Sequence, residues 1–293
     1  MLAVVISGSL RTFEEIWSGN QHLINSLGIP YKVFFHTWDK DYKTVRKVYK
    51  DNKLGGFAFG IKPKEYSGSS RSVDLEDICR IIPSAKISIE TFQEQQIAEF
   101  LKIPAKNENV LFQNMVNSVA MYMGISRAFQ LALSDEDTSK FTHFLRIRTD
   151  FQICQSISRQ KLDADIYFCG PIVDTGYGAV SDQCFFVKAD IAILMANLES
   201  KVSEHVVLNG WGVHSGLPFY GERILAYFLQ NLRDSSSFEY SPTIGQIKRP
   251  PTQPVQGQNW PNWIYELLRF NLSVVERRFK FVAGKLFRYF KHF

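Results

Sequence analysis

A chain of 293 residues is long enough to bury a large apolar core within one domain. Its composition, with 45% hydrophobic and 22% charged residues, is that of a globular protein and excludes disorder as the general state. The net charge of +5 comes with Lys and Arg that become denser toward the C-terminus, where the stretch from Arg269 to Lys291 is basic. This placement favours an anionic surface over a nucleic acid as the partner of that end.

The four cysteines lie far apart and form no C-x-x-C pair: Cys79, Cys154, Cys169 and Cys184. This spacing excludes the usual zinc-ligand and thiol redox motifs and favours a reducing cytoplasm. No stretch approaches the roughly 20 consecutive apolar residues that cross a bilayer. Membrane contact is therefore expected to be peripheral.

The first elements in chain order indicate a parallel α/β unit. Residues 2–6 are apolar and β-branched, as in a strand that is covered on both faces. Thr12 and Glu15 have the spacing of a capping box and predict a helix from there to about Leu27. Residues 31–37 predict a second strand. Strand, helix and strand in this order form a βαβ unit.

The remaining elements continue the same alternation of strands and helices. Residues 39–84 are charged and rich in Gly and Ser, which indicates loops with short helices, and Thr91 is placed to cap a helix that ends near residue 101. Periodicity predicts strands at 87–89, 144–150, 165–169 and 183–187, and helices at 109–133, 190–198 and 222–229. Four prolines in residues 235–259 predict a linker without regular structure. The predicted fold is a mostly parallel, mixed sheet flanked by helices.

The strand at 144–150 carries the first candidate site. A carboxylate at the C-terminal end of a buried strand lies where open α/β sheets bind ligands, and Asp150 has this position. Arg146 and Arg148 project to one face of the strand, where they can bind a diphosphate. Asp150 can ligate Mg²⁺ or Mn²⁺ together with diphosphate oxygens. The alternative is a structural ion pair at the strand end.

The turn after the first strand is the second candidate. Its small residues allow a ligand to approach the backbone, the following helix presents unpaired N–H groups, and Arg11 adds a cation. The residues assigned to nucleotide binding in this turn are Ser7, Gly8, Ser9, Arg11 and Thr12. The alternative is a tight strand-to-helix turn of purely structural use.

Further acidic groups are candidates for catalysis. Asp182 follows the glycine-rich residues 176–178 and can act as a general base, or it can cap its own backbone as a turn residue. Glu222 opens a predicted helix, with Trp211 and His214 nearby in the sequence, and is the third catalytic candidate. Residues 36–39, which end the second predicted strand, are expected to border the site.

Several of these segments resemble one bacterial family in order and spacing. They are VVISGSLRTF, HTWD, NSVAMYMGISRAFQLAL, FLRIRTDFQI and GYGAVSDQCFFVKADI. Over roughly residues 1–230 they are similar to polysaccharide glycosyltransferases grouped with the WavE lipopolysaccharide-synthesis family. The resemblance implies a GT-A-like nucleotide-sugar fold, with Asp150 at the donor and metal, Arg11 in the nucleotide loop and Asp182 in a D-Q pair. Asp150 stands alone where related folds carry D-x-D.

The C-terminal tail has its own pattern. From Trp260 onward, apolar residues recur at near-helical spacing among many Lys and Arg residues, which is typical of a helix that lies on anionic lipid. The alternative is a helix that packs on the domain core. We therefore expect three parts: a glycosyltransferase domain at 1–245, a Pro-rich linker at 246–259 and a basic amphipathic helix at 260–293.

Together these observations predict an enzyme that transfers a sugar from a nucleotide-sugar donor to a lipid-linked or oligosaccharide acceptor. The expected setting is the synthesis of a surface glycan, such as lipopolysaccharide, O-antigen or capsule, at the inner face of the cytoplasmic membrane. Two alternatives remain open. One is a non-catalytic, membrane-associated scaffold of a polysaccharide synthesis complex, and the other is a nucleotidyl- or sugar-phosphate transferase.

Overall fold

The computed structural model describes most of the first 250 residues. The ranges described are 1–10, 12–41, 71–93, 96, 113–170, 173–174, 179–209, 225, 228–229, 238–240 and 244–248. The chain divides into two compact units, Met1–Pro250 and Pro251–Phe293. The second unit, which includes the tail, lies outside the described residues, so its predicted helix and the domain boundaries stay predictions.

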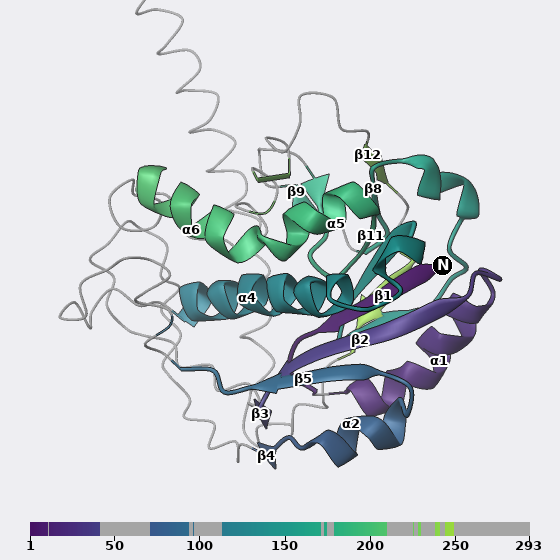
Figure 1. Cartoon of the computed structure of the whole chain (residues 1–293), viewed down its shortest axis with the longest axis horizontal. Coiled ribbons are helices and arrows are strands. Elements are labelled where there is room, and N and C mark those ends of the chain that lie inside the picture. The colour runs from purple at the N-terminus through teal and green to yellow at the C-terminus, as the bar shows by residue number, and fades with distance from the viewer. Residues whose placement is uncertain are drawn as a thin grey trace, which may run out of the picture. The chain divides into compact units, whose positions relative to one another are not determined.

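A seven-stranded sheet forms the centre of the first unit, in the order β12-β8-β11-β6-β1-β2-β5 (Figure 1). Its strands are β1 (Leu2–Ser7), β2 (Tyr31–Trp38), β5 (Lys86–Glu90), β6 (His143–Arg148), β8 (Ile166–Phe168), β11 (Cys184–Lys188) and β12 (Phe238–Tyr240). β11 is antiparallel to β6 and β8, and the other neighbouring pairs are parallel. The predicted mostly parallel, mixed sheet is confirmed.

Helices cover both faces of this sheet. α4 (Gln113–Leu133), α5 (Ala189–Ala196) and α6 (Leu198–Asn209) pack on one face, and α1 (Phe13–Asn25) and α2 (Leu75–Ile81) on the other. Successive side chains of β1 alternate between the two cores: Ala3 and Val5 face α4, whereas Val4 and Ile6 face α1. Burial on both faces explains why β1 is apolar at every position from Leu2 to Ile6.

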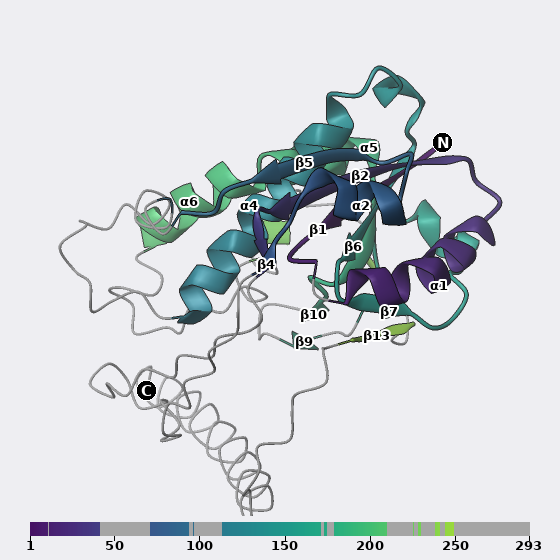
Figure 2. The same cartoon turned by 90° about the horizontal axis from the view of Figure 1, so that it is seen from below.

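The smaller elements flank this framework. Short paired strands are β3 (Lys40–Asp41) with β4 (Arg71–Ser72), β9 (Val173–Asp174) with β10 (Ala179–Val180), and β7 (Phe151–Ile153) with β13 (Gly245–Ile247). Figure 2 shows β7 and β13 beside α1. The buried Asn20 of α1 binds β7 at two points, because its amide donates to the Phe151 carbonyl at 2.9 Å and accepts from the Ile153 N–H at 2.8 Å.

The segment predicted to be an irregular linker contains two strands. β12 forms an edge of the main sheet, and β13 pairs with β7 through Gly245, Gln246 and Ile247. The prediction for residues 235–259 is therefore wrong at these positions. Each strand is only three residues long and neither contains a proline, since Pro242 falls between them. A proline prevents strand pairing only at a position where a backbone N–H is needed as the hydrogen-bond donor.

The predicted capping box at the start of α1 is also wrong. Thr12 is the N-cap residue, but its side chain makes no hydrogen bond to the helix. Its hydroxyl donates instead to the Lys248 carbonyl at 2.8 Å, 236 residues along the chain. Local sequence spacing does not reveal such a distant acceptor.

This difference gives a stability prediction. Thr12→Val keeps the shape of the buried side chain but leaves the Lys248 carbonyl without its donor, so we expect the free energy of unfolding to fall by about 1 kcal/mol. Glu15→Gln, at an exposed position, is expected to leave it unchanged. Chemical denaturation of the two variants measures both effects. Equal losses would show that Thr12 and Glu15 act together as a capping box in solution.

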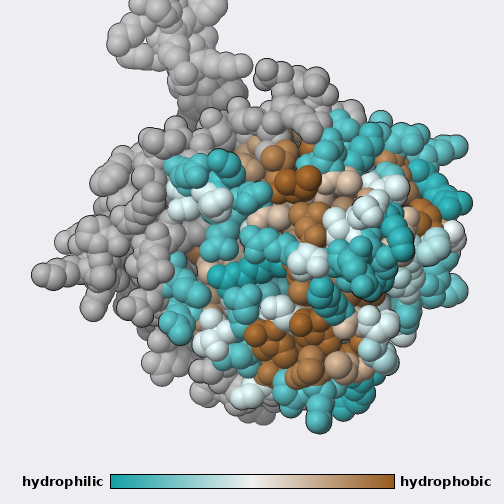
Figure 3. Space-filling model, viewed as in Figure 1, coloured by the Kyte–Doolittle hydropathy of each residue, from teal (hydrophilic) through white to brown (hydrophobic). Residues whose placement is uncertain are grey.

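The surface seen in Figure 3 is patterned by hydropathy. Apolar residues gather over α5 and again over β5 and α2, and polar residues lie between these patches, over α4. None of the described helices combines the length and apolar character required to cross a bilayer.

Candidate active site

The candidate residues meet at the carboxyl edge of the central strands. β1 and β6 are parallel with Ser7 opposite Arg148, so the turn after β1 and the residues after β6 leave the sheet at the same edge. The Thr149 hydroxyl donates to the Ser9 carbonyl at 2.5 Å, which ties the two loops together. Residues that are about 140 positions apart in the chain thus form one surface.

Gly8 is the point of closest approach between these loops. Its φ of 136° lies in a region that side chains with a Cβ rarely adopt, and a Cβ there would lie 2.6 Å from the Thr149 hydroxyl oxygen. Its carbonyl accepts a hydrogen bond from the Thr37 hydroxyl of β2 at 2.8 Å. The turn is therefore held from both neighbouring strands.

Arg148 lies between two carboxylates at this edge. Its Nε donates to Asp150 Oδ1 at 2.5 Å and its Nη1 to Asp182 Oδ2 at 2.9 Å. The Arg148 side chain is 21% exposed, whereas those of Asp150 and Asp182 are 1% and 3% exposed. Burial opposes the charge of Arg148, but Asp182 and Asp150 outweigh it, and its pKa lies above the ordinary value. The result is a fixed guanidinium that reaches the surface at the end of β6.

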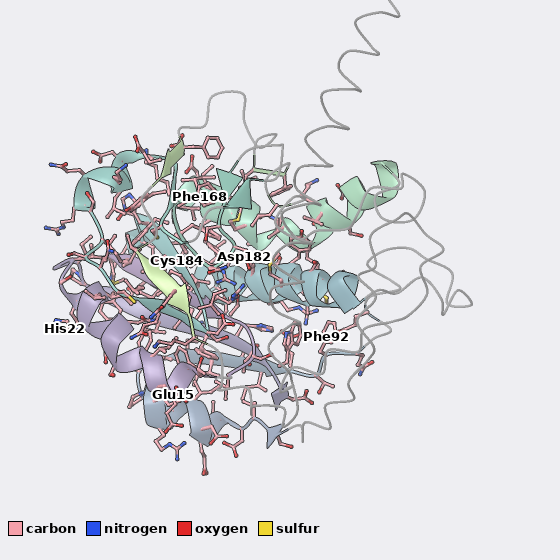
Figure 4. The ribbon with its side chains drawn as sticks, turned by 180° about the vertical axis from the view of Figure 1, so that it is seen from behind. Glu15, His22, Phe92, Phe168, Asp182 and Cys184 are labelled. Carbon is pink, nitrogen blue, oxygen red and sulfur yellow. The ribbon has the colours of Figure 1, made fainter. Side chains whose placement is uncertain are left out.

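Asp182 reaches Arg148 from the start of β11, which neighbours β6 on the side opposite β1. It lies just before β11, whose first residue is Cys184, and Figure 4 shows both near the middle of the molecule. Arg148 N–H donates to the Gln183 carbonyl at 2.8 Å, so the backbone holds this segment against β6. The two acidic residues proposed from the sequence are thus brought to one arginine. The ion pair of Arg148 with Asp150 is the alternative that the sequence left open at this strand end, and the pairing with Asp182 was not predicted.

Arg146 has a more enclosed position than its neighbour. It is 1% exposed, and its guanidinium donates to the Gln183 carbonyl at 3.0 Å and to the Ser7 hydroxyl at 3.4 Å. Burial lowers the pKa of Arg146 to about 10. The contacts with Ser7 and Gln183 support the predicted common face of Arg146 and Arg148. The side chain of Arg146 is thus used within the fold, in contact with Ser7 and Gln183, and its assignment to diphosphate binding stays a prediction.

The arrangement does not fit a bound Mg²⁺ or Mn²⁺. Mg²⁺ usually keeps several waters beside one or two carboxylates, and the side chains of Asp150 and Asp182 are almost fully buried and paired with Arg148. A cation between them would have to replace the guanidinium. The described part of the chain also contains no group of three His, Cys, Asp or Glu side chains placed to hold a metal.

The other candidates divide into two groups. Ser7, Gly8, Ser9 and Thr12 lie at the carboxyl edge of β1, as their positions in the sequence predict. Residues outside the described part of the chain are Arg11, residues 176–178, Trp211, His214 and Glu222. Their roles stay predictions.

A second polar cluster, which the sequence does not indicate, lies at the same edge of the sheet. Glu90, the last residue of β5, binds Arg127 of α4, and its Oε1 lies 3.2 Å from Nε2 of the buried His36. Hydrogen bonding to His36 is the main cause that holds the pKa of Glu90 below its ordinary value. The sequence places His36 at the end of a strand, but Glu90 and Arg127 are too far apart in the chain for spacing to connect them.

Comparisons with known proteins give structural neighbours only. No protein-family model and no curated protein matches the chain, so the WavE resemblance stays a prediction. Among solved structures it is similar to the galactosyltransferase LgtC in complex with donor and acceptor sugar analogs, at 10% identity and a TM-score of 0.40, over 82% of this chain and 73% of that one. It is also similar to mouse xyloside xylosyltransferase 1, at 7% identity and a TM-score of 0.37, over 82% of this chain and 83% of that one. A third is a glycosyltransferase involved in glycosylation of the major capsid of PBCV-1, at 12% identity and a TM-score of 0.31, over 57% and 71%.

Proposed function

We propose that this protein is a glycosyltransferase that uses a nucleotide-sugar donor. The observation that carries the proposal is Arg148, fixed by Asp150 and Asp182 at the carboxyl edge of β6 and beside the turn after β1. This is the edge at which open α/β sheets bind ligands. The motifs that resemble those of polysaccharide glycosyltransferases lie in the same segments and favour the same conclusion.

The proposed chemistry follows from charge. In the transfer, an acceptor hydroxyl oxygen bonds to the anomeric carbon of the donor sugar while the bond from that carbon to the diphosphate oxygen breaks. Negative charge develops on the departing diphosphate, and a cation that is already fixed in place stabilises it without reorganisation. We assign this role to Arg148. Ser7, Gly8 and Ser9 form the adjoining turn, and the proposal keeps their assignment to nucleotide binding.

Asp150 and Asp182 receive positioning roles in this proposal. Each accepts a hydrogen bond from Arg148, and neither side chain is more than 3% exposed. A general base must reach the proton that it removes, so the burial of Asp182 favours its holding Arg148 over deprotonating an acceptor. Glu222, outside the described residues, remains a candidate for that base.

Product analysis distinguishes the proposal from its rivals. The full-length protein is incubated with UDP-, GDP-, CMP- and dTDP-sugars, and released phosphate compounds are separated by chromatography. A glycosyltransferase or slow donor hydrolase releases the nucleoside phosphate of the donor. A parallel incubation with nucleoside triphosphates and sugar 1-phosphates tests for a nucleotidyltransferase, which would release pyrophosphate. No product in either incubation, with and without mixed oligosaccharide acceptors, would support the scaffold.

The fit of Arg148 between the carboxylates gives a prediction about metals. We expect turnover of the donor to continue after dialysis against EDTA, with kcat within about twofold of its value in Mn²⁺, because Arg148 supplies the positive charge at the diphosphate. The check is nucleoside diphosphate release across a series of Mg²⁺ and Mn²⁺ concentrations. Activity that vanishes with EDTA and returns with Mn²⁺ would restore the sequence-based assignment of Asp150 as a metal ligand.

The biological setting is proposed from the sequence. Resemblance to the WavE-type enzymes favours a lipid-linked or polysaccharide acceptor and the synthesis of lipopolysaccharide, O-antigen or capsule. The basic, apolar-patterned tail from Trp260 favours peripheral association with anionic lipid at the inner face of the cytoplasmic membrane. Vesicle sedimentation at low and high salt tests this part, since the cationic attraction is screened by salt.

A further inference from the structure

A polar pocket lies apart from Arg148, between α4 and the corner where α5 meets α6. Its volume is about 430 Å³, which is within the range of small-molecule sites. Eight of its ten lining residues carry a hydrogen-bonding side chain, and the exceptions are Met123 and Ala196. Polar residues also dominate the surface over α4 in Figure 3.

The walls of the pocket are fixed to each other. The carbonyl of Ala196, at the end of α5, accepts hydrogen bonds from the Ser126 hydroxyl at 2.5 Å and from the Gln130 amide at 2.8 Å, both on α4. Next to Ala196, the Asn197 amide donates to the Ile193 carbonyl at 2.9 Å. Side chains held in this way offer their remaining donors and acceptors in set directions, which lowers the entropy cost of binding a ligand.

Charge and polarity restrict the kind of ligand. Arg127 is the only cation among the described lining residues, and it pairs with Glu90 and lies 3.7 Å from Glu199. The two carboxylates leave no net positive charge beside Arg127, since no second lysine or arginine is among the described lining residues, whereas Arg146 balances the carboxylates beside Arg148. The pocket therefore disfavours phosphate or another anion, and the scarcity of apolar lining disfavours a lipid chain. A neutral ligand rich in hydroxyl groups, such as a sugar residue, matches this mixture of donors and acceptors.

The position of the pocket relates it to the proposed reaction. Arg127 binds Glu90 at the carboxyl end of β5, and Arg148 ends β6, so both lie at one edge of the sheet. Three strand spacings separate β5 from β6, about 14 Å in total. A ligand bound near Arg127 is thus too far away to be the reacting sugar, but an acceptor chain of several residues is long enough to connect the two places.

We propose that this pocket binds a neutral sugar residue of the acceptor chain, a few residues away from the hydroxyl that reacts. The inference rests on the proposed glycosyltransferase function. It assigns Arg127, Gln130, Asn197 and Glu199 to the recognition of hydroxyl groups. Acceptors that are too short to reach from the reaction site to the pocket gain no binding affinity from the pocket.

The test uses full-length protein on an array of neutral glucan, galactan and mannan oligosaccharides of one to about six residues. We expect binding to at least one of the longer oligosaccharides and weaker binding to its shorter forms. Ser200→Leu, which adds bulk at the exposed rim, should weaken this binding about tenfold or more, whereas Ser200→Ala leaves the space open and should retain it. Lys201→Leu adds the same side chain one position along α6, outside the pocket, and should also retain it.

The outcomes separate this inference from the function on which it rests. No binding to any oligosaccharide, or equal losses in Ser200→Leu and Lys201→Leu, overturns the pocket assignment. Donor turnover in the same preparations, measured as nucleoside phosphate release, reports on the proposed function alone. Donor turnover without glycan binding would support the glycosyltransferase function and contradict the proposed acceptor subsite. Glycan binding that is weakened by Ser200→Leu, without turnover of any donor, would support a sugar-binding site in the pocket and contradict the proposed enzyme function.

Discussion

Arg148→Gln is expected to lower kcat for sugar transfer by roughly 10²- to 10³-fold, because the leaving diphosphate loses its fixed cation. KM for the donor should change less if the guanidinium acts mainly on the charge that develops in the transition state. Steady-state release of nucleoside diphosphate measures both constants. A folded variant with the wild-type kcat would contradict the role of Arg148 in the reaction.

The same substitution also affects stability, since it leaves Asp150 and Asp182 buried without their cation. Breaking a buried ion pair by removal of one partner costs about 3–5 kcal/mol. Arg148→Lys separates the two effects: the ammonium retains a charge but lacks the planar fork that binds both carboxylates. We expect Arg148→Lys to be more stable than Arg148→Gln, with a kcat that is still below that of the wild type. Arg80→Gln, on the exposed side of α2, is the control and should change neither quantity.

Gly8→Ala is expected to lower the free energy of unfolding by about 3 kcal/mol or more. Two costs add: a φ of 136° is strained for any residue with a Cβ, by about 1–3 kcal/mol, and the new methyl group would lie 2.6 Å from the Thr149 hydroxyl oxygen. Relief of the clash would displace the turn from β6, so kcat should fall as well. Thermal and denaturant unfolding, together with donor turnover, measure these losses.

Two further variants test the cause of the Gly8 effect. Adding Thr149→Ala to Gly8→Ala removes the clashing oxygen and should recover part of the lost stability, which a double-mutant cycle detects as coupling between the sites. Gly19→Ala introduces the same methyl group within α1, where the nearest atom is 4.0 Å away, and should stabilise the helix slightly. A loss in Gly19→Ala equal to that in Gly8→Ala would mean that the turn is not specially constrained.

Periodicity and composition were sufficient to predict the central sheet. The apolar run from Leu2 to Ile6 and the alternation that ends at Arg148 mark strands because burial on one or two faces imposes those patterns on the sequence. The position of Asp150 at a strand end followed from the same reasoning. These features depend on the local succession of apolar and polar residues, which a single sequence contains.

What the sequence did not predict depends on long-range contacts. The partner of Asp182 is Arg148, 34 residues away, and the hydroxyl of Thr12 binds a carbonyl 236 residues away instead of its own helix. The strands β12 and β13 are too short to produce a periodic signal, and the prolines near them favoured a linker. In each case the decisive partner is chosen by the tertiary fold, and no local spacing indicates it.

The late position of Lys248 in the chain has a consequence for folding. Its N–H donates to the Asp150 carbonyl at 2.7 Å and its carbonyl accepts from Thr12, so this one residue connects both loops of the candidate site. During synthesis the N-terminal βαβ unit leaves the ribosome long before residue 248. The two loops can therefore be joined through Lys248 only after that residue has left the ribosome, by contacts of high sequence separation that form slowly.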